Sequence, residues 1–142
     1  MPGEVRSERL RYRPWRAGDA PHLLPILEAN REHLAGWIPR HVAEPLPVPE
    51  LAARLRGFTA EFESDREWRY AIVSADREEI LGEVSLFPRN SRERTTYSDA
   101  DRAEIGYWLQ ADATGRGFAT EAARPYLAGS ASRLRRQSKR PA

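Results

Sequence analysis

The stretch that decides the fold reads Ala103-Glu104-Ile105-Gly106-Tyr107-Trp108-Leu109, followed after four residues by Thr114-Gly115-Arg116-Gly117-Phe118-Ala119-Thr120-Glu121-Ala122-Ala123. Its first part has the apolar character of a strand, and its second part is a tight glycine turn that opens a helix. Gly115 and Gly117 allow unusual backbone angles and let the backbone approach a ligand closely. The free N–H groups and the dipole of the helix start favour an anion there. The stretch therefore predicts a strand, a phosphate-binding turn and a helix.

The rest of the chain predicts further strands and helices around this unit. Residues 10–13 alternate as a half-buried strand that stops at a proline, and residues 19–33 read as a helix with Asp19 as its N-cap and Pro25 in its early part. A loop with four prolines fills residues 39–49. Leu51, Leu55, Phe58 and Phe62 then recur at helical spacing. Strands are expected at 68–73 and 80–87, a polar loop at 90–100, and a helix from Gly117 to about residue 127.

Three segments together resemble one branch of the GNAT family of N-acetyltransferases, the branch that acetylates ribosomal-protein N-termini. Residues 112–117 resemble the family's loop Gln/Arg-x-x-Gly-x-Gly/Ala, with Asp112 in place of the Gln or Arg. Residues 30–39 (Asn-Arg-Glu-His-Leu-Ala-Gly-Trp-Ile-Pro) resemble the segment between that branch's first two helices. Residues 7–15 resemble its opening strand. The segments follow the family's order from about Glu8 to about Leu127.

The resemblance implies an α+β fold of the GNAT type, a mixed sheet built in the order strand–helix–helix–strand–strand–strand–helix. In the family a fifth strand lies parallel to the fourth, and the helix from Gly117 would be the crossover between them. Residues 128–137 contain one large apolar residue, Leu134, and no β-branched one, so they are unsuited to a buried parallel strand. We therefore expect a partial acetyltransferase domain at residues 1–127, truncated or frame-shifted, and a basic tail without fixed structure at 128–142.

Acetyl-CoA is the cosubstrate that the resemblance implies. Its pantetheine arm would pair with the backbone of Trp108 and Leu109, and a backbone N–H near Leu109 would stabilise the oxyanion. The pyrophosphate would lie on the turn and helix start, whose residues are Thr114, Gly115, Arg116, Gly117, Phe118, Ala119 and Thr120. Arg116 could contact phosphate or simply be solvated. Trp37 would line the acceptor pocket, or else anchor the turn between two helices.

Acetyl transfer to an amine needs a base, and two carboxylates in apolar strands are the candidates. Glu104 shares a strand face with Gly106 and Trp108, and a carboxylate in such a strand calls for a reason. The alternative is a Glu104 that pairs with an arginine such as Arg69 or is exposed at a strand end. Glu83 is the second candidate.

Two functions of different class follow from the sequence. The first is an acetyl-CoA-dependent N-acetyltransferase that acts on a protein N-terminus or a small-molecule amine and is impaired by the loss of its C-terminal part. The second is a non-catalytic remnant that binds CoA weakly or not at all. An open apolar strand at 103–109 would also offer its unpaired backbone to the same strand of a second copy, so a homodimer could form through the sheet edge.

Composition limits the other functions. The 142 residues include 31% charged residues and no cysteine, which excludes disulfides and a thiolate zinc site. The three histidines lack metal-ligand spacing, so we expect no metal. No apolar run is long enough to span a bilayer, and we expect a cytoplasmic protein with no membrane partner.

Residues 124–142 hold six basic residues and no acidic residue. The net charge of +2 is therefore the sum of +6 for this C-terminal segment and −4 for the residues before it. A nucleic-acid arm is disfavoured because no aromatic residue lies among the basic residues from Arg133 to Arg140.

Overall fold

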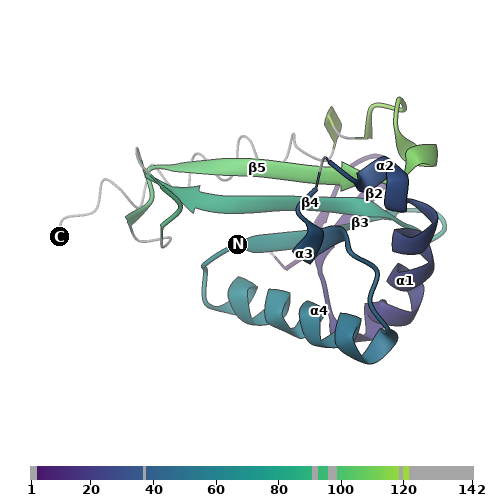
Figure 1. The fold of residues 1–142 in the computed structure, drawn as a ribbon. Helices are drawn as coiled ribbons and strands as arrows, with labels where there is room; N and C mark the ends of the chain where they lie inside the picture. Colours follow the sequence, from purple (N-terminus) through teal and green to yellow (C-terminus); the bar gives the residue numbers. More distant parts are fainter. Residues whose placement is uncertain (1–2, 37, 91–92, 96–98, 119, 122–142) are drawn as a thin grey trace.

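The computed structural model of the chain describes residues 3–36, 38–90, 93–95, 99–118 and 120–121. Its strands form one antiparallel sheet whose strands follow the order of the chain: β1 (Val5–Arg6), β2 (Leu10–Pro14), β3 (Trp68–Ser74), β4 (Ile80–Arg89) and β5 (Arg102–Leu109). The two long strands β4 and β5 lie side by side (Figure 1), with Gly82 opposite Leu109 and Arg89 opposite Arg102. In the described sheet, β5 is therefore an edge strand.

The helices come between β2 and β3 and cover one face of the sheet. They are α1 (Ala20–Ala29), α2 (Arg31–Leu34), α3 (Arg40–Ala43) and α4 (Val48–Glu63). Leu51 and Leu55 of α4 are fully buried, as the helical spacing predicts. They pack with α1 against the alternate sheet residues that point to this face, which are Ala71, Val73, Ile80 and Trp108. A second cluster on the other face contains Tyr12, Tyr70, Ile72, Val84 and Leu86.

The predicted α+β order is confirmed, with two differences near the N-terminus. The two-residue strand β1 was not predicted, because two residues carry no periodicity. The single helix expected from Asp19 to residue 33 is two helices that meet at Asn30, which has φ −109° and ψ 15°. Asp19 stands at the N-cap position of α1, but its carboxylate accepts two hydrogen bonds from the Arg13 guanidinium, both at 2.9 Å, in place of capping that helix.

The expected loop at 39–49 is corrected by the structure, and the helix expected from Gly117 lies only partly within the described residues. The expected proline-rich loop at 39–49 contains the short helix α3, and Pro49 already belongs to the first turn of α4. At the other end, the Glu121 N–H donates to the Gly117 carbonyl at 3.0 Å, which is the i to i−4 bond of a helix start. The remainder of that predicted helix and the predicted tail lie outside the described residues.

Gly82 lets the backbones of β4 and β5 approach each other at the end of their ladder. A Cβ at this position would lie 2.0 Å from the Trp108 carbonyl oxygen and 2.9 Å from the Leu109 Cα. We expect Gly82→Ala to force the strands apart and to lower the free energy of unfolding by at least roughly 1–3 kcal/mol, the usual cost of overpacking. Denaturant unfolding measures this, with Gly57→Ala in α4 as the control because nothing lies within 4 Å of a Cβ there. Equal midpoints for Gly82→Ala and the wild type would contradict the close approach.

Candidate active site

The outer edge of β5 presents backbone groups that the described strands do not use. The Gln110 N–H donates to the backbone of β4 at 2.8 Å, and the Trp108 carbonyl also faces β4. Successive residues of a strand point their N–H and C=O groups to opposite sides. The backbone groups of Ile105, Tyr107 and Leu109 therefore point outward, toward any ligand that lies along this edge.

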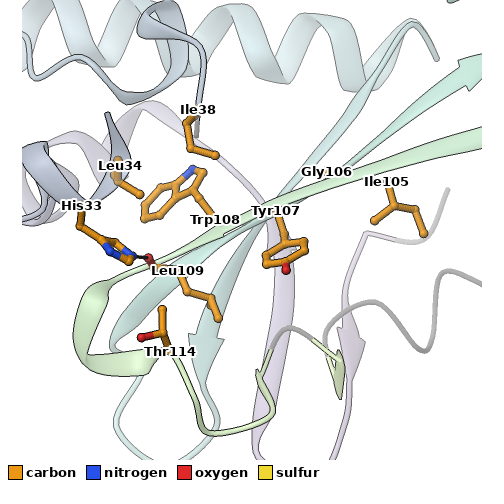
Figure 2. A pocket seen from close by; sticks show the side chains of 9 residues that line it. All are labelled: His33, Leu34, Ile38, Ile105, Gly106, Tyr107, Trp108, Leu109 and Thr114. Carbon is orange, nitrogen blue, oxygen red and sulfur yellow. Dashed lines mark hydrogen bonds between the residues drawn. The ribbon is translucent and has the colours of Figure 1, made fainter. Parts of the chain in front are cut away.

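A cavity of about 330 Å³ runs along the same edge (Figure 2). The described residues that line it come from four places: α2, the segment that follows α2, β5, and the loop after β5. They are His33, Leu34, Ile38, Ile105, Gly106, Tyr107, Trp108, Leu109 and Thr114. Most of these side chains are apolar. A cavity with apolar walls and an unpaired strand edge suits an extended ligand that carries amide groups.

Two side chains one turn apart fix α2 against the end of β5. The His33 Nε2 lies 3.1 Å from the outward-pointing carbonyl oxygen of Leu109 (Figure 2). The buried Asn30 side chain accepts a hydrogen bond from the Ala111 N–H at 2.8 Å and donates to the Ile26 carbonyl at 2.8 Å. The segment 30–39 that resembles the ribosomal-protein branch thus begins at the end of the candidate site. Trp37, predicted to line the acceptor pocket, lies outside the described residues.

The loop after β5 has the backbone conformation that its glycines predict. A 3₁₀ turn at Ala111–Ala113 leads into Thr114, and Gly115 and Gly117 both have φ +76°, in the left-handed region that side chains disfavour. Both glycines and Arg116 are exposed, whereas Phe118 is buried. The loop therefore offers backbone to a ligand at the end of the β5 edge. Thr120 is exposed, and the side chain of Ala119 lies outside the described residues.

The turn between β1 and β2 holds the residues after this loop in place. The Glu121 carboxylate accepts hydrogen bonds from the Ser7 hydroxyl at 2.5 Å, the Arg9 N–H at 2.9 Å and the Arg9 Nε at 2.7 Å. The Arg9 guanidinium stacks on the Phe118 ring at 4.3 Å. Burial raises the pKa of the adjoining Tyr12 phenol to about 12. A direct ion pair thus joins the segment 7–15 to Glu121, four positions after Gly117.

The Glu121 ion pair predicts a pH dependence of stability. Burial alone would raise the pKa of the Glu121 carboxyl, but the hydrogen bonds from Ser7 and Arg9 hold it below the ordinary 4.5. A depressed pKa stabilises the fold above the unfolded value, and that stability is lost as the pH falls through the folded value. We expect Glu121→Gln to be less stable than the wild type at neutral pH, with a smaller difference at an acidic pH below the ordinary carboxyl value of 4.5. Urea unfolding at both pH values measures it; a pH-independent difference would contradict the ion pair.

Glu104 is an ion-paired carboxylate at the far end of β5 from the glycine loop. It accepts hydrogen bonds from Arg89 at 2.8 Å and Arg94 at 3.2 Å, and its side chain is 37% exposed. The hydrogen bond from Arg89 has the largest effect and lowers the pKa of the Glu104 carboxyl, and the hydrogen bond from Arg94 lowers it further. A pairing with arginine was the alternative for this residue, although the partners are not Arg69. A lowered pKa weakens Glu104 as a base, and its assignment as the base stays a prediction.

Glu83 lies inside the helix-side core. Its carboxylate accepts hydrogen bonds from the Trp15 indole N–H at 2.9 Å and from Arg69 at 3.1 Å. Burial raises the pKa of the Glu83 carboxyl, and the Arg69 charge opposes the increase. Neither Glu83 nor Glu104 lines the cavity along β5. Each of the two candidate bases is thus hydrogen-bonded to an arginine, away from the cavity that a ligand would occupy.

The sequence did not single out His33, which lines the cavity and contacts the end of β5. In the sequence, His33 is one residue of the segment 30–39 and one of three histidines without metal-ligand spacing, and its contact joins residues that are 76 positions apart. In the part of the chain that the structure describes, no group of three or more His, Asp or Glu side chains could hold a metal ion. The helices among the described residues are too short or too polar to cross a membrane.

Comparison with known proteins identifies the family. A model of the acetyltransferase (GNAT) domain matches residues 9–137, and the chain therefore belongs to the GNAT acetyltransferase family. The chain is 25% identical over 120 residues to the probable N-acetyltransferase YjcK of Bacillus subtilis (strain 168). That match covers 84% of this chain and 63% of YjcK, so the chain spans less than two thirds of this relative.

Solved structures show the same fold. RimL, a ribosomal L7/L12 alpha-N-protein acetyltransferase in complex with coenzyme A, matches with a TM-score of 0.70 at 18% identity, over 89% of this chain and 66% of RimL. The ribosomal-protein-S5-alanine acetyltransferase from Vibrio fischeri matches with a TM-score of 0.65 at 19% identity, over 89% of this chain and 68% of that one. At such identities the likeness concerns the fold. The predicted division at residue 127 stays a prediction.

Proposed function

We propose that the chain binds acetyl-CoA along the open edge of β5 and transfers the acetyl group to a primary amine. One observation carries the proposal: the apolar cavity follows an unpaired strand edge that ends at a loop with two positive-φ glycines. The edge offers amide pairing to an extended chain, and the loop offers N–H groups to an anion. Acetyl-CoA combines these two chemistries, with amides in its pantetheine arm and charge in its pyrophosphate.

The residues that would hold acetyl-CoA follow from this placement. The outward backbone groups of Tyr107 and Leu109 would pair with the pantetheine amides, beside the side chain of Trp108. The pyrophosphate would lie against the backbone from Thr114 to Thr120, Ala119 included. Arg116 is exposed next to these N–H groups and could add a charge-assisted contact.

The reaction forms a C–N bond and breaks the C–S bond of the thioester. An ammonium group first loses a proton, the free amine attacks the thioester carbonyl carbon, and an outward backbone N–H of β5, beyond the pantetheine contacts, stabilises the oxyanion. The thiolate then leaves and accepts the second proton of the amine. Because the structurally similar RimL and S5-alanine enzymes are named for ribosomal proteins, a protein N-terminus is the first acceptor to test, with small-molecule amines as the alternative.

A transfer assay tests the proposal. The chain contains no cysteine, so a thiol reagent reports only the CoA that the reaction releases. We expect CoA release from acetyl-CoA to depend on an added peptide or small-molecule amine. A chain that binds CoA by calorimetry but releases none with any amine would be the non-catalytic remnant.

The same edge predicts self-association. The unpaired backbone of β5 can pair with β5 of a second copy as well as with a ligand. We therefore expect concentration-dependent dimers in light scattering, and we expect saturating CoA to dissociate them because both occupants need Tyr107 and Leu109. A monomer at every concentration without CoA would contradict pairing through this edge.

A further inference from the structure

Gly106 leaves an opening on the helix-covered face of β5. It shares this face with Trp108, because alternate residues of a strand point to the same side. Gly106 lines the cavity and lies directly opposite Ser85 of β4. A Cβ on Gly106 would lie 3.0 Å from the Ser85 hydroxyl oxygen and 3.7 Å from the ring of Phe87. Because Gly106 has no Cβ, the space beside the Ser85 hydroxyl stays open at the wall of the cavity.

Neither the backbone angles nor a neighbouring backbone requires a glycine at this position. Gly115 and Gly117 have positive φ, whereas Gly106 does not. A Cβ on Gly82 would meet the backbone of β5, whereas a Cβ on Gly106 would meet only two side-chain atoms of β4 within 4 Å, apart from its chain neighbours. A glycine inside a strand weakens the strand and often marks the place where a ligand approaches closely. Gly106 therefore indicates a ligand on this face of β5.

The Ser85 hydroxyl is the polar group that such a ligand would meet. Ser85 is only 4% exposed, and its hydroxyl forms no hydrogen bond with any of the described residues. Its oxygen is not one of the fully enclosed unpaired atoms, which belong to Arg11, Arg13 and Trp108. A buried hydroxyl without a partner lowers the stability of the fold, and a ligand that supplies the partner removes this cost.

The placement of acetyl-CoA brings its thioester to Gly106. With the pyrophosphate at the glycine loop and the pantetheine amides on Leu109 and Tyr107, the end of the pantetheine arm continues toward Ile105. Two carbons and a sulfur separate the last amide from the acetyl group, which is about the rise of one strand residue, roughly 3.3 Å. The thioester carbonyl therefore lies beside Gly106, at the opposite end of the cavity from the loop.

Gly106 also decides the face from which an amine can attack. Attack on a carbonyl carbon comes from above or below the carbonyl plane, with the nitrogen about 3–3.5 Å away. On one face of β5 the side chains of Ile105 and Tyr107 stand beside the thioester, whereas on the helix-covered face Gly106 leaves the approach free (Figure 2). An amine on this approach passes next to the Ser85 hydroxyl.

We propose that Ser85 binds the acceptor amine through the opening at Gly106, an assignment that rests on the proposed function. The hydroxyl oxygen accepts a hydrogen bond from an N–H of the amine and holds its nitrogen over the thioester carbon. Ser85 takes no proton in this role, so the proton balance of the transfer is unchanged. A primary amine fits the opening because its nitrogen carries a single substituent.

Ser85→Ala separates this role from a structural one. With trialanine as the amine, we expect its KM to rise roughly 10–100-fold, the effect of losing one hydrogen bond to a charged group, while acetyl-CoA affinity by calorimetry is unchanged. The midpoint of denaturant unfolding should be equal to that of the wild type or higher, because the hydroxyl has no described partner to lose. Ser64→Ala, which removes an exposed hydroxyl at the end of α4, is the matched control and should keep the wild-type KM.

Gly106→Ala tests the opening itself. Its Cβ would fill the space beside Ser85, and the fold should persist because the serine hydroxyl can rotate away. We expect the KM of trialanine to rise as in Ser85→Ala, with CoA affinity unchanged because CoA uses the outer edge of β5. A wild-type KM in both variants, or a lower stability of Ser85→Ala, would overturn the assignment.

A binding measurement distinguishes this assignment from the proposed function. In ¹H–¹⁵N spectra of the CoA complex, added trialanine should shift the amide of Gly106 in the wild type and leave it unchanged in Ser85→Ala. If the chain acetylates no amine but this difference is seen, the proposed transfer fails and the amine site stands. If trialanine does not shift the Gly106 amide of the wild type, the assignment of Ser85 is wrong.

Discussion

Arg69→Met is expected to destabilise the fold by roughly 3–5 kcal/mol, because it leaves a carboxylate buried without its cation. The Arg69 Nη1 donates a hydrogen bond to Glu83 at 3.1 Å, and its Nε donates one to Glu67 at 3.0 Å. The side chains of Arg69 and Glu83 are only 7% and 3% exposed. The guanidinium also lies 4.8 Å from the ring centroid of Phe58. The substitution therefore removes two ion pairs and a stacking contact at once.

The stability that Arg69→Met removes should depend on pH in a defined direction. Burial raises the pKa of Glu83, and a raised pKa means that stability is lost as the pH rises through the folded value. The loss caused by Arg69→Met should therefore be larger at neutral pH than in acid, where the protonated carboxyl needs no cation. Denaturant unfolding of Arg69→Met and of Arg69→Met with Glu83→Gln measures this, and the double variant should recover part of the loss.

Arg66→Met is the matched control for this experiment. Arg66 lies 3.7 Å from Glu61, and its side chain is 66% exposed. Such a surface pair contributes about 0–1 kcal/mol. If Arg69→Met cost no more than Arg66→Met, the buried pair would not stabilise the core.

Gly117→Val is expected to abolish CoA binding. Gly117 has φ +76°, and a β-branched residue is strained there. A valine would also place methyl groups on the backbone that the pyrophosphate should approach. Titration calorimetry with CoA should give no measurable heat, while circular dichroism keeps the wild-type signal.

Gly36→Val separates strain from ligand contact. Gly36 has φ +83° and has nothing within 4 Å of a Cβ, so it carries the same conformational penalty outside the loop. We expect it to bind CoA like the wild type. Unchanged affinity in Gly117→Val, or an equal loss in Gly36→Val, would refute the assignment of the loop as the pyrophosphate site.

The sequence predicted the elements whose residues carry a local pattern. The apolar run at 103–109 is β5, the recurrence of Leu51 and Leu55 is α4, and the paired glycines at 115 and 117 have positive φ. Each of these depends on neighbours in the chain, through alternation, helical period or backbone freedom.

The sequence did not predict features that depend on distant contacts. Asn30 divides the first helix, and its side chain bonds to Ala111, 81 positions away. His33 meets Leu109 across a similar separation, and only the folded chain brings them together. The arginine partners of Glu104 come from β4 and the loop after it, where no spacing rule identifies them.

The most direct test of the account is a map of the backbone amides that change when CoA binds. In ¹H–¹⁵N spectra of the chain, saturating CoA should shift the amides of Tyr107, Leu109, Gly115 and Gly117. The amide of Ile72, inside the sheet, should stay unchanged. Shifts confined to another surface, such as the cavity beside Arg13 and His22, would contradict the claim that the β5 edge and the glycine loop form the acetyl-CoA site.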